Sequence, residues 1–165
     1  MIKMYIKALD NKILILMALA LIASPTLCGK NTYTICLIYS HYLCIYLNNL
    51  FLMLQYQQID RINALNDSII TRIGATKFYF YTYIEIILVG IIYNCIIYIS
   101  YYFFFGTIPS SQFQLTIFFM IINIIIMSIE NSIIYLQIGK KKRFIYLAIP
   151  ILMNLLFHLS FTQVF

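Results

Sequence analysis

Long apolar stretches, almost free of charge, constrain the fold of this chain more than any other feature. They cover residues 13–28, 33–56, 78–105, 113–138 and 144–165. A helix crosses the hydrocarbon core of a bilayer with about 20 apolar residues, each adding roughly 1.5 Å. We therefore expect an all-α polytopic transmembrane bundle of about five spans, with residues 1–165 forming a single integral membrane domain.

The composition excludes an ordinary soluble domain. Hydrophobic residues make up 63% of the chain and charged residues 10%, whereas a soluble domain carries about a quarter charged residues. Lys and Arg outnumber Asp and Glu by 11 to 5, which in a soluble protein would indicate nucleic-acid binding. Here the bases fall between apolar runs, so the bilayer is the expected partner and nucleic acid is not.

Metal and cofactor chemistry is not indicated. The four cysteines show neither metal-ligand spacing nor a CxxC pair. We interpret them as small apolar packing residues and expect no metal and no cofactor.

The distribution of bases predicts the topology, because Lys and Arg concentrate in cytoplasmic loops. With the N-terminus in the cytoplasm, the outer segments hold only Lys30. The inner segments then hold Lys3, Lys7, Lys12, Arg61, Arg72, Lys77, Lys140, Lys141, Lys142 and Arg143. This predicts an N-in, C-out, multi-pass protein of the cell membrane, with the bacterial cytoplasmic membrane as its expected location.

The N-terminal segment "MIKMYIKALDN" has its charges at helical spacing. Lys3, Lys7 and Asp10 are four and three residues apart, which favours an amphipathic helix lying in the membrane interface. The alternative is a tail that only carries topogenic charges. Residues 1–28 also have the outline of a cleavable signal peptide, although no A-x-A-like site follows. Cleavage would leave the orientation of the other spans unchanged.

A polar segment, "QQIDRINALNDSIITRIGATK", separates the second and third apolar runs. Apolar residues recur in it every three or four positions, at Ile59, Ile62, Leu65, Ile69 and Ile73. This periodicity predicts a cytoplasmic amphipathic helix over residues 57–74. Gly74 stands where a C-terminal glycine is favoured, Arg72 complements the helix dipole, and Lys77 marks the headgroup level.

Two interpretations of this segment remain open. It is either a solvated connector lying on the membrane or a docking surface for a cytoplasmic partner. Residues 57–77 are far more than the roughly two to eight usual between helices of a bundle. The length of the segment therefore favours the docking surface over the simple connector.

An interfacial helix before the first span, followed by a helical cytoplasmic segment between spans two and three, resembles the permease subunit of ABC-2-type exporters. The run "RIGATKFY", residues 72–79, is similar to an R-apolar-G-x-x-K-aromatic pattern of short permeases from bacteriocin, lantibiotic and peptide-export or self-protection loci. The resemblance covers about residues 1–100. That family usually has six spans with both ends inside, whereas five spans are predicted here.

The resemblance implies a membrane-spanning subunit that couples a separate ATPase to movement of a peptide or other amphipathic cargo. The chain has no GxxxxGK[ST] motif, so ATP hydrolysis would belong to another subunit and the chain itself is not expected to be an enzyme. The implied ATPase contact lies at Arg61, Asp67, Arg72, Gly74 and Lys77. Five helices are few to enclose a path, so a second copy or a sister permease is also expected. The alternative is a non-transporting accessory or immunity protein that binds a partner within the bilayer.

Two acids lie inside predicted spans. Glu85 and Glu130 are each about 11–12 Å from the cytoplasmic end of their span. An acid in lipid tends to face the bundle interior or a water path. Either both are neutral and hydrogen-bonded, or they form a proton or cation site or a polar lining for a cationic peptide.

Other polar residues form single stripes along three predicted spans. These are His41, Cys44, Asn48 and Gln55; Asn123, Glu130 and Gln137; and Asn154 and His158. Such stripes are typical of interhelical hydrogen-bonding seams, and a transport path is the alternative. His41 and Cys44 could act together as a peptidase pair, but no third orienting group is evident.

Overall fold

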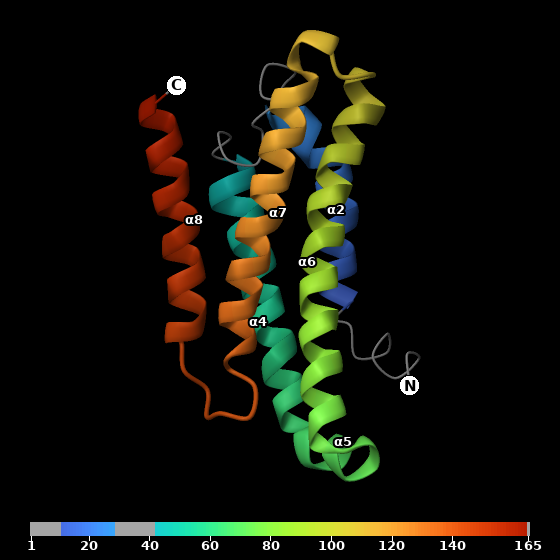
Figure 1. Ribbon diagram of the computed structural model, residues 1–165, viewed down its shortest axis with the longest axis vertical. Coiled ribbons are helices and arrows are strands. Elements are labelled where there is room, and N and C mark those ends of the chain that lie inside the picture. The colour runs from blue at the N-terminus through green and yellow to red at the C-terminus, as the bar shows by residue number, and fades with distance from the viewer. Residues whose placement is uncertain (1–10, 29–41, 165) are drawn as a thin grey trace.

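The chain is a bundle of helices, seen in a computed structural model that describes residues 11–28 and 42–164 (Figure 1). Its elements are α2 (Asn11–Cys28), the π-helix η2 (Tyr42–Asn48), α4 (Asn49–Ala64), α5 (Asn66–Ile73), α6 (Ala75–Phe105), the short 3₁₀ helix η3 (Ser110–Gln112), α7 (Phe113–Tyr135) and α8 (Ile145–Val164). The all-α prediction is confirmed for these residues. The predicted interfacial helix and the first part of the predicted span 33–56 lie outside them.

Two helical stretches are long and apolar enough to cross a membrane, Ala75–Phe105 and Ser110–Tyr135. Their 31 and 26 residues correspond to about 46 Å and 39 Å, against about 30 Å for a hydrocarbon core. Shorter apolar helices cover Asn11–Ala23 and Ile145–Ser160. These four segments coincide with four of the five apolar runs.

The bundle is held together by close packing around α6 and α7. Helix α6 contacts α2 and α7, and α7 also contacts α4 and α8. Gly90 of α6 lies so close to α7 that a Cβ there would clash with Nδ2 of Asn131, a small-residue approach typical of helices in lipid. The rings of Phe51 and Tyr93 stack with centroids 4.2 Å apart, and the Tyr93 hydroxyl donates to Oδ1 of Asn48 at 3.2 Å.

The two ends of the bundle differ in charge. The corner formed by α4, α5 and α6 and the α7–α8 loop lie at the same end, shown at the bottom of Figure 1, and the 106–112 loop lies at the other. The lower end holds Arg61, Arg72, Lys77 and residues 140–143, whereas the sequence "GTIPSSQ" of the upper loop has no charge. In Figure 1 the corner also projects beyond the first residues of α2 and α8.

The helix expected over residues 57–74 is divided in two. Helix α4 continues through the first half, because Gln58, Ile59 and Ile62 remain buried in the bundle. It ends at Leu65, whose φ of −103° and ψ of 1° leave the helical range. In the first turn of α5, Ser68 Oγ donates to the Leu65 carbonyl oxygen at 2.8 Å, a local side-chain bond to a backbone acceptor three residues earlier.

Candidate functional site

The exposed polar surface at the lower end centres on α5, and no residue of this helix is buried. Three of its apolar residues pack partly against the core, Ile69, Ile70 and Ile73. Its other face is open, with Asp67, Ser68, Thr71 and Arg72 exposed. Helix α5 therefore lies against the bundle by one side and offers a polar face to its surroundings.

Gly74 joins this helix to α6 and has a φ of 86°, a conformation that residues with a side chain rarely adopt. Its N–H donates to the Ile70 carbonyl oxygen at 2.8 Å, which closes α5. The predicted C-terminal glycine thus ends α5 with a positive φ, but its ψ of 150° lies outside the left-handed helical region. Arg61 and Lys77, the other predicted contact residues, are exposed on α4 and α6 to either side of α5. The structure brings this whole predicted set to one end of the bundle.

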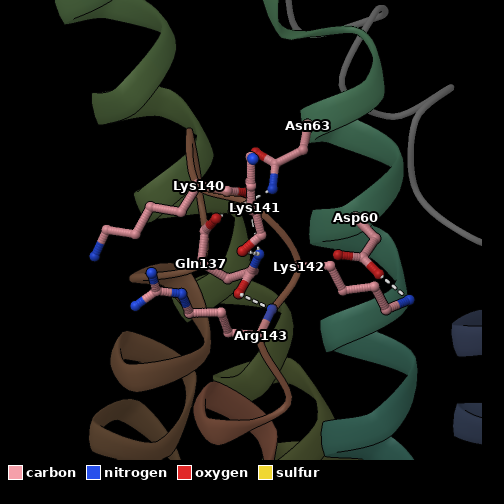
Figure 2. Close-up of polar contacts among 7 residues, drawn as sticks. All are labelled: Asp60, Asn63, Gln137, Lys140, Lys141, Lys142 and Arg143. Atoms are coloured by element: carbon pink, nitrogen blue, oxygen red, sulfur yellow. Dashed lines mark hydrogen bonds and ion pairs between the residues drawn. The ribbon is translucent and has the colours of Figure 1, made fainter.

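The α7–α8 loop at the same end is fixed by two amide side chains (Figure 2). Asn63 of α4 donates from Nδ2 to the Gln137 carbonyl oxygen at 3.1 Å and accepts from the Gly139 N–H at 2.9 Å. The side chain of Gln137, which is 0% exposed, donates to the carbonyl oxygens of Lys140 and Lys141 at 3.2 and 3.0 Å. It also accepts from the Arg143 N–H at 3.1 Å. The loop that carries four consecutive bases therefore has a defined shape.

Two of these bases have partners. Lys142 forms an ion pair with Asp60 of α4 and lies 5.6 Å from the ring centroid of Tyr56. The hydrogen bond to Asp60 raises the pKa of Lys142 above its usual value. Lys140 donates to the Tyr146 hydroxyl at 3.1 Å. Residues 137–143 are thereby linked to both α4 and α8.

Sequence reasoning did not identify the anchoring roles of Asn63 and Gln137. Gln137 was placed in a polar stripe of the fourth span, but the helix ends at Tyr135 and Gln137 faces the backbone of the loop instead. The sequence signal for this ordered loop was Gln137 and Gly139 just before the run of bases at residues 140–143. Gly139 has a φ of 70°, the kind of position where glycine ends a helix.

The two predicted intramembrane acids lie on neighbouring helices. Glu85 is half-buried on α6 and accepts a hydrogen bond from Gln58 Nε2 at 3.0 Å. Glu130 on α7 is 1% exposed, and its Oε1 has no hydrogen-bonding partner among the residues that the structure describes. Gln55 on α4 is fully buried, and neither polar atom of its amide has a partner within residues 11–28 and 42–164.

Gln55 and Glu130 lie at a similar height in the bundle. Helices α4 and α7 run in the same direction (Figure 1) and are joined near their ends by the Asn63–Gln137 hydrogen bond. Counting back eight residues on α4 and seven on α7 places both side chains about 10–12 Å from that bond. A polar layer thus crosses the bundle interior, and both a hydrogen-bonding seam and an ion site are chemically compatible with it.

The remaining predicted polar residues have mixed outcomes. Asn123 donates to the Tyr98 hydroxyl at 2.6 Å, and Asn154 donates to Asn49 Oδ1 at 2.8 Å, so these two contribute to seams between helices. His158 is 1% exposed. His41 lies outside the described residues, so the structure does not test its pairing with Cys44, which the sequence disfavours for want of a third orienting group.

Comparisons with protein-family models, with curated proteins and with solved structures give no match. A function can therefore be proposed only from the chain's own residues and from the charged end that they form.

Proposed function

We propose that the chain is the membrane-spanning subunit of an ABC-type exporter, embedded in the cell membrane with its basic end in the cytoplasm. In this proposal a separate ATPase docks on α5 and its flanks and drives movement of a peptide or other amphipathic cargo. The predicted fifth span, N-in and C-out orientation, and pairing with a second copy or a sister permease belong to the same proposal.

The observation that carries the proposal is the position of α5. A helix with a polar outer face lies at the end of an apolar bundle, packs against the 31-residue helix α6 and is joined to it by the single residue Gly74. A push on α5 would therefore reach the core of the bundle through α6, which packs on α2 and α7. Helix shifts of this kind are a common way to switch between two packings.

Charge on the exposed face gives the contact its expected specificity. Asp67 stands in the first turn of α5 and Arg72 in the last, so each complements the helix dipole and both side chains are exposed. Exposed charges at an interface act mainly on partner choice and on the rate of association. Reversing one of them should weaken docking while leaving the bundle folded.

The test is capture of the ATPase by the tagged full-length protein from detergent-solubilised native membranes. The captured partner must contain a GxxxxGK[ST] motif by mass spectrometry and must hydrolyse ATP. We expect Arg72→Glu to reduce its recovery at least tenfold. Lys141→Glu makes the same charge change at the same end but away from α5, and should leave recovery unchanged.

Two results would contradict the proposal. Equal recovery with Arg72→Glu and the wild-type chain would remove α5 as the docking surface. Capture of no such ATPase would favour the alternative, an accessory or immunity protein that binds its partner within the bilayer.

A further inference from the structure

We propose that the α7–α8 loop binds the phosphate headgroup of an anionic phospholipid through Lys141 and Arg143. This inference rests on the membrane embedding in the proposed function, but not on the ATPase. The site consists of the loop residues 139–143 and the first exposed residues of α8.

The first argument is that the loop is pre-shaped. The buried Gln137 side chain holds three backbone groups of the loop, and Asn63 holds its beginning. Figure 2 shows both amides directed into the loop, with the basic side chains extending from it. A pre-shaped loop loses less conformational entropy on binding than a flexible basic tail would.

The second argument is which charges remain available. Asp60 neutralises Lys142, and Lys140 is engaged with Tyr146. Lys141 and Arg143 are exposed, and among the described residues neither side chain has an acidic partner. Two cations that flank a paired lysine are suited to an anionic oxygen group, and arginine binds phosphate well because its donors form a planar fork.

The third argument distinguishes a lipid from other anions. Phe144 and Ile145 follow the loop directly and are 70% and 54% exposed. Farther along α8, Leu152 and Leu156 are also exposed, by 57% and 63%. A headgroup on the loop would place its acyl chains along this apolar face. A nucleic acid or an acidic peptide has no apolar part that would cover this face, and basic clusters beside membrane helices are typical sites for anionic lipids.

The experiment measures lipid binding to the purified full-length protein in a neutral detergent by native mass spectrometry. The probes are phosphatidylglycerol and phosphatidylcholine with the same acyl chains. We expect tighter binding of phosphatidylglycerol to the wild-type chain. The Lys141→Gln/Arg143→Gln double variant should bind it about 30-fold more weakly. Each base near an anionic lipid surface contributes about 1 kcal/mol to binding, and about 1.4 kcal/mol corresponds to a tenfold change in affinity.

The matched control is Arg72→Gln/Lys77→Gln, which removes the same two charges from the corner at the same end. It should retain wild-type binding of phosphatidylglycerol. Equal binding of the two lipids by the wild-type chain, or equal losses in both double variants, would overturn the proposal. A cooperative thermal transition in each variant shows that it is folded.

Failure of this inference can be told apart from failure of the proposed function. If the chain is extracted from membranes only by detergent and captures the ATPase, but shows no preference for phosphatidylglycerol, the lipid site alone is refuted. If the Lys141→Gln/Arg143→Gln variant loses lipid preference and still captures the ATPase, both proposals are supported independently.

Discussion

Replacing Gln137 by Met tests whether one buried side chain gives the basic loop its shape. Methionine has a similar length and no hydrogen-bonding group, so the substitution removes three hydrogen bonds with little change in volume. A hydrogen bond contributes about 0.5–1.5 kcal/mol net. Losing all three should destabilise the closed loop by about 2–3 kcal/mol, because water replaces part of the lost hydrogen bonding.

Trypsin is a direct probe of this loop, because residues 140–143 are all Lys or Arg. When cleavage follows local opening, its rate scales with the population of the open form. A loss of about 2–3 kcal/mol therefore predicts cleavage about 30- to 150-fold faster at these bonds. The same hydrogen bonds are lost from the folded chain, so the midpoint of thermal unfolding should also fall, by about 5–10 °C.

The matched control is Gln114→Met, the same substitution at an exposed position in the first turn of α7. It should leave both the cleavage rate and the unfolding midpoint unchanged. Cleavage of Gln137→Met at the wild-type rate would refute the argument that this side chain holds the loop.

Three further predictions test other parts of the structure. Gly74→Ala places a side chain at a φ of 86° and a ψ of 150°, with no atom within 4 Å of its Cβ, so backbone strain alone should cost about 1–3 kcal/mol and lower the unfolding midpoint by about 2–10 °C. Gln55→Leu should raise the unfolding midpoint, because a buried amide with no partner among the described residues costs about 1–3 kcal/mol and the substitution removes it. Gln58→Leu should instead lower the midpoint, because it breaks the hydrogen bond to the Glu85 carboxyl group. A lower midpoint for Gln55→Leu would indicate a bound partner in the polar layer. Because the hydrogen bond to Asp60 raises the pKa of Lys142 in the folded chain, its contribution to stability is fully present below the ordinary lysine value of 10.5 and is lost as pH rises through the raised pKa. Thermal unfolding followed from pH 9 to 12 should show this loss in the wild-type chain and not in Asp60→Asn.

Much of the fold was predictable because helix formation in apolar runs depends mainly on local sequence. The apolar run 78–105 forms most of α6, which ends at Phe105, just before Gly106 with a φ of 80°. Helix α6 begins at Ala75 because Gly74 interrupts the helical backbone before it. The sequence had indicated Gly74 as a helix end. The run 144–165 likewise coincides with α8.

The division at Leu65 was not predictable, because the apolar period continues through it. Ile62, Leu65 and Ile69 keep a step of three or four residues, as one helix would. The structure separates them by tertiary contacts. Ile62 is 3% exposed within the bundle, whereas Leu65 is 54% exposed where the neighbouring helices end.

The candidate site was predictable in part for the same reason. Exposure of Arg72 and Lys77 follows from their position between apolar runs, and it is observed. The bond from Asn63 to the loop joins positions 74 residues apart, and no periodicity in one segment reveals such a pairing. The order of the loop was therefore visible only once α4 and α7 were placed side by side.

The orientation of the basic end is the central claim, and cysteine labelling in intact cells tests it most directly. Ser68 on α5 and Ser111 in η3 are exposed at opposite ends of the bundle. Each is changed to cysteine in a chain whose four native cysteines are replaced by alanine, and cells are treated with a membrane-impermeant maleimide. The account predicts labelling of Ser111→Cys in intact cells and of Ser68→Cys only after permeabilisation. Labelling of Ser68→Cys in intact cells would place α5 outside, where no ATPase could reach it, and would contradict the account.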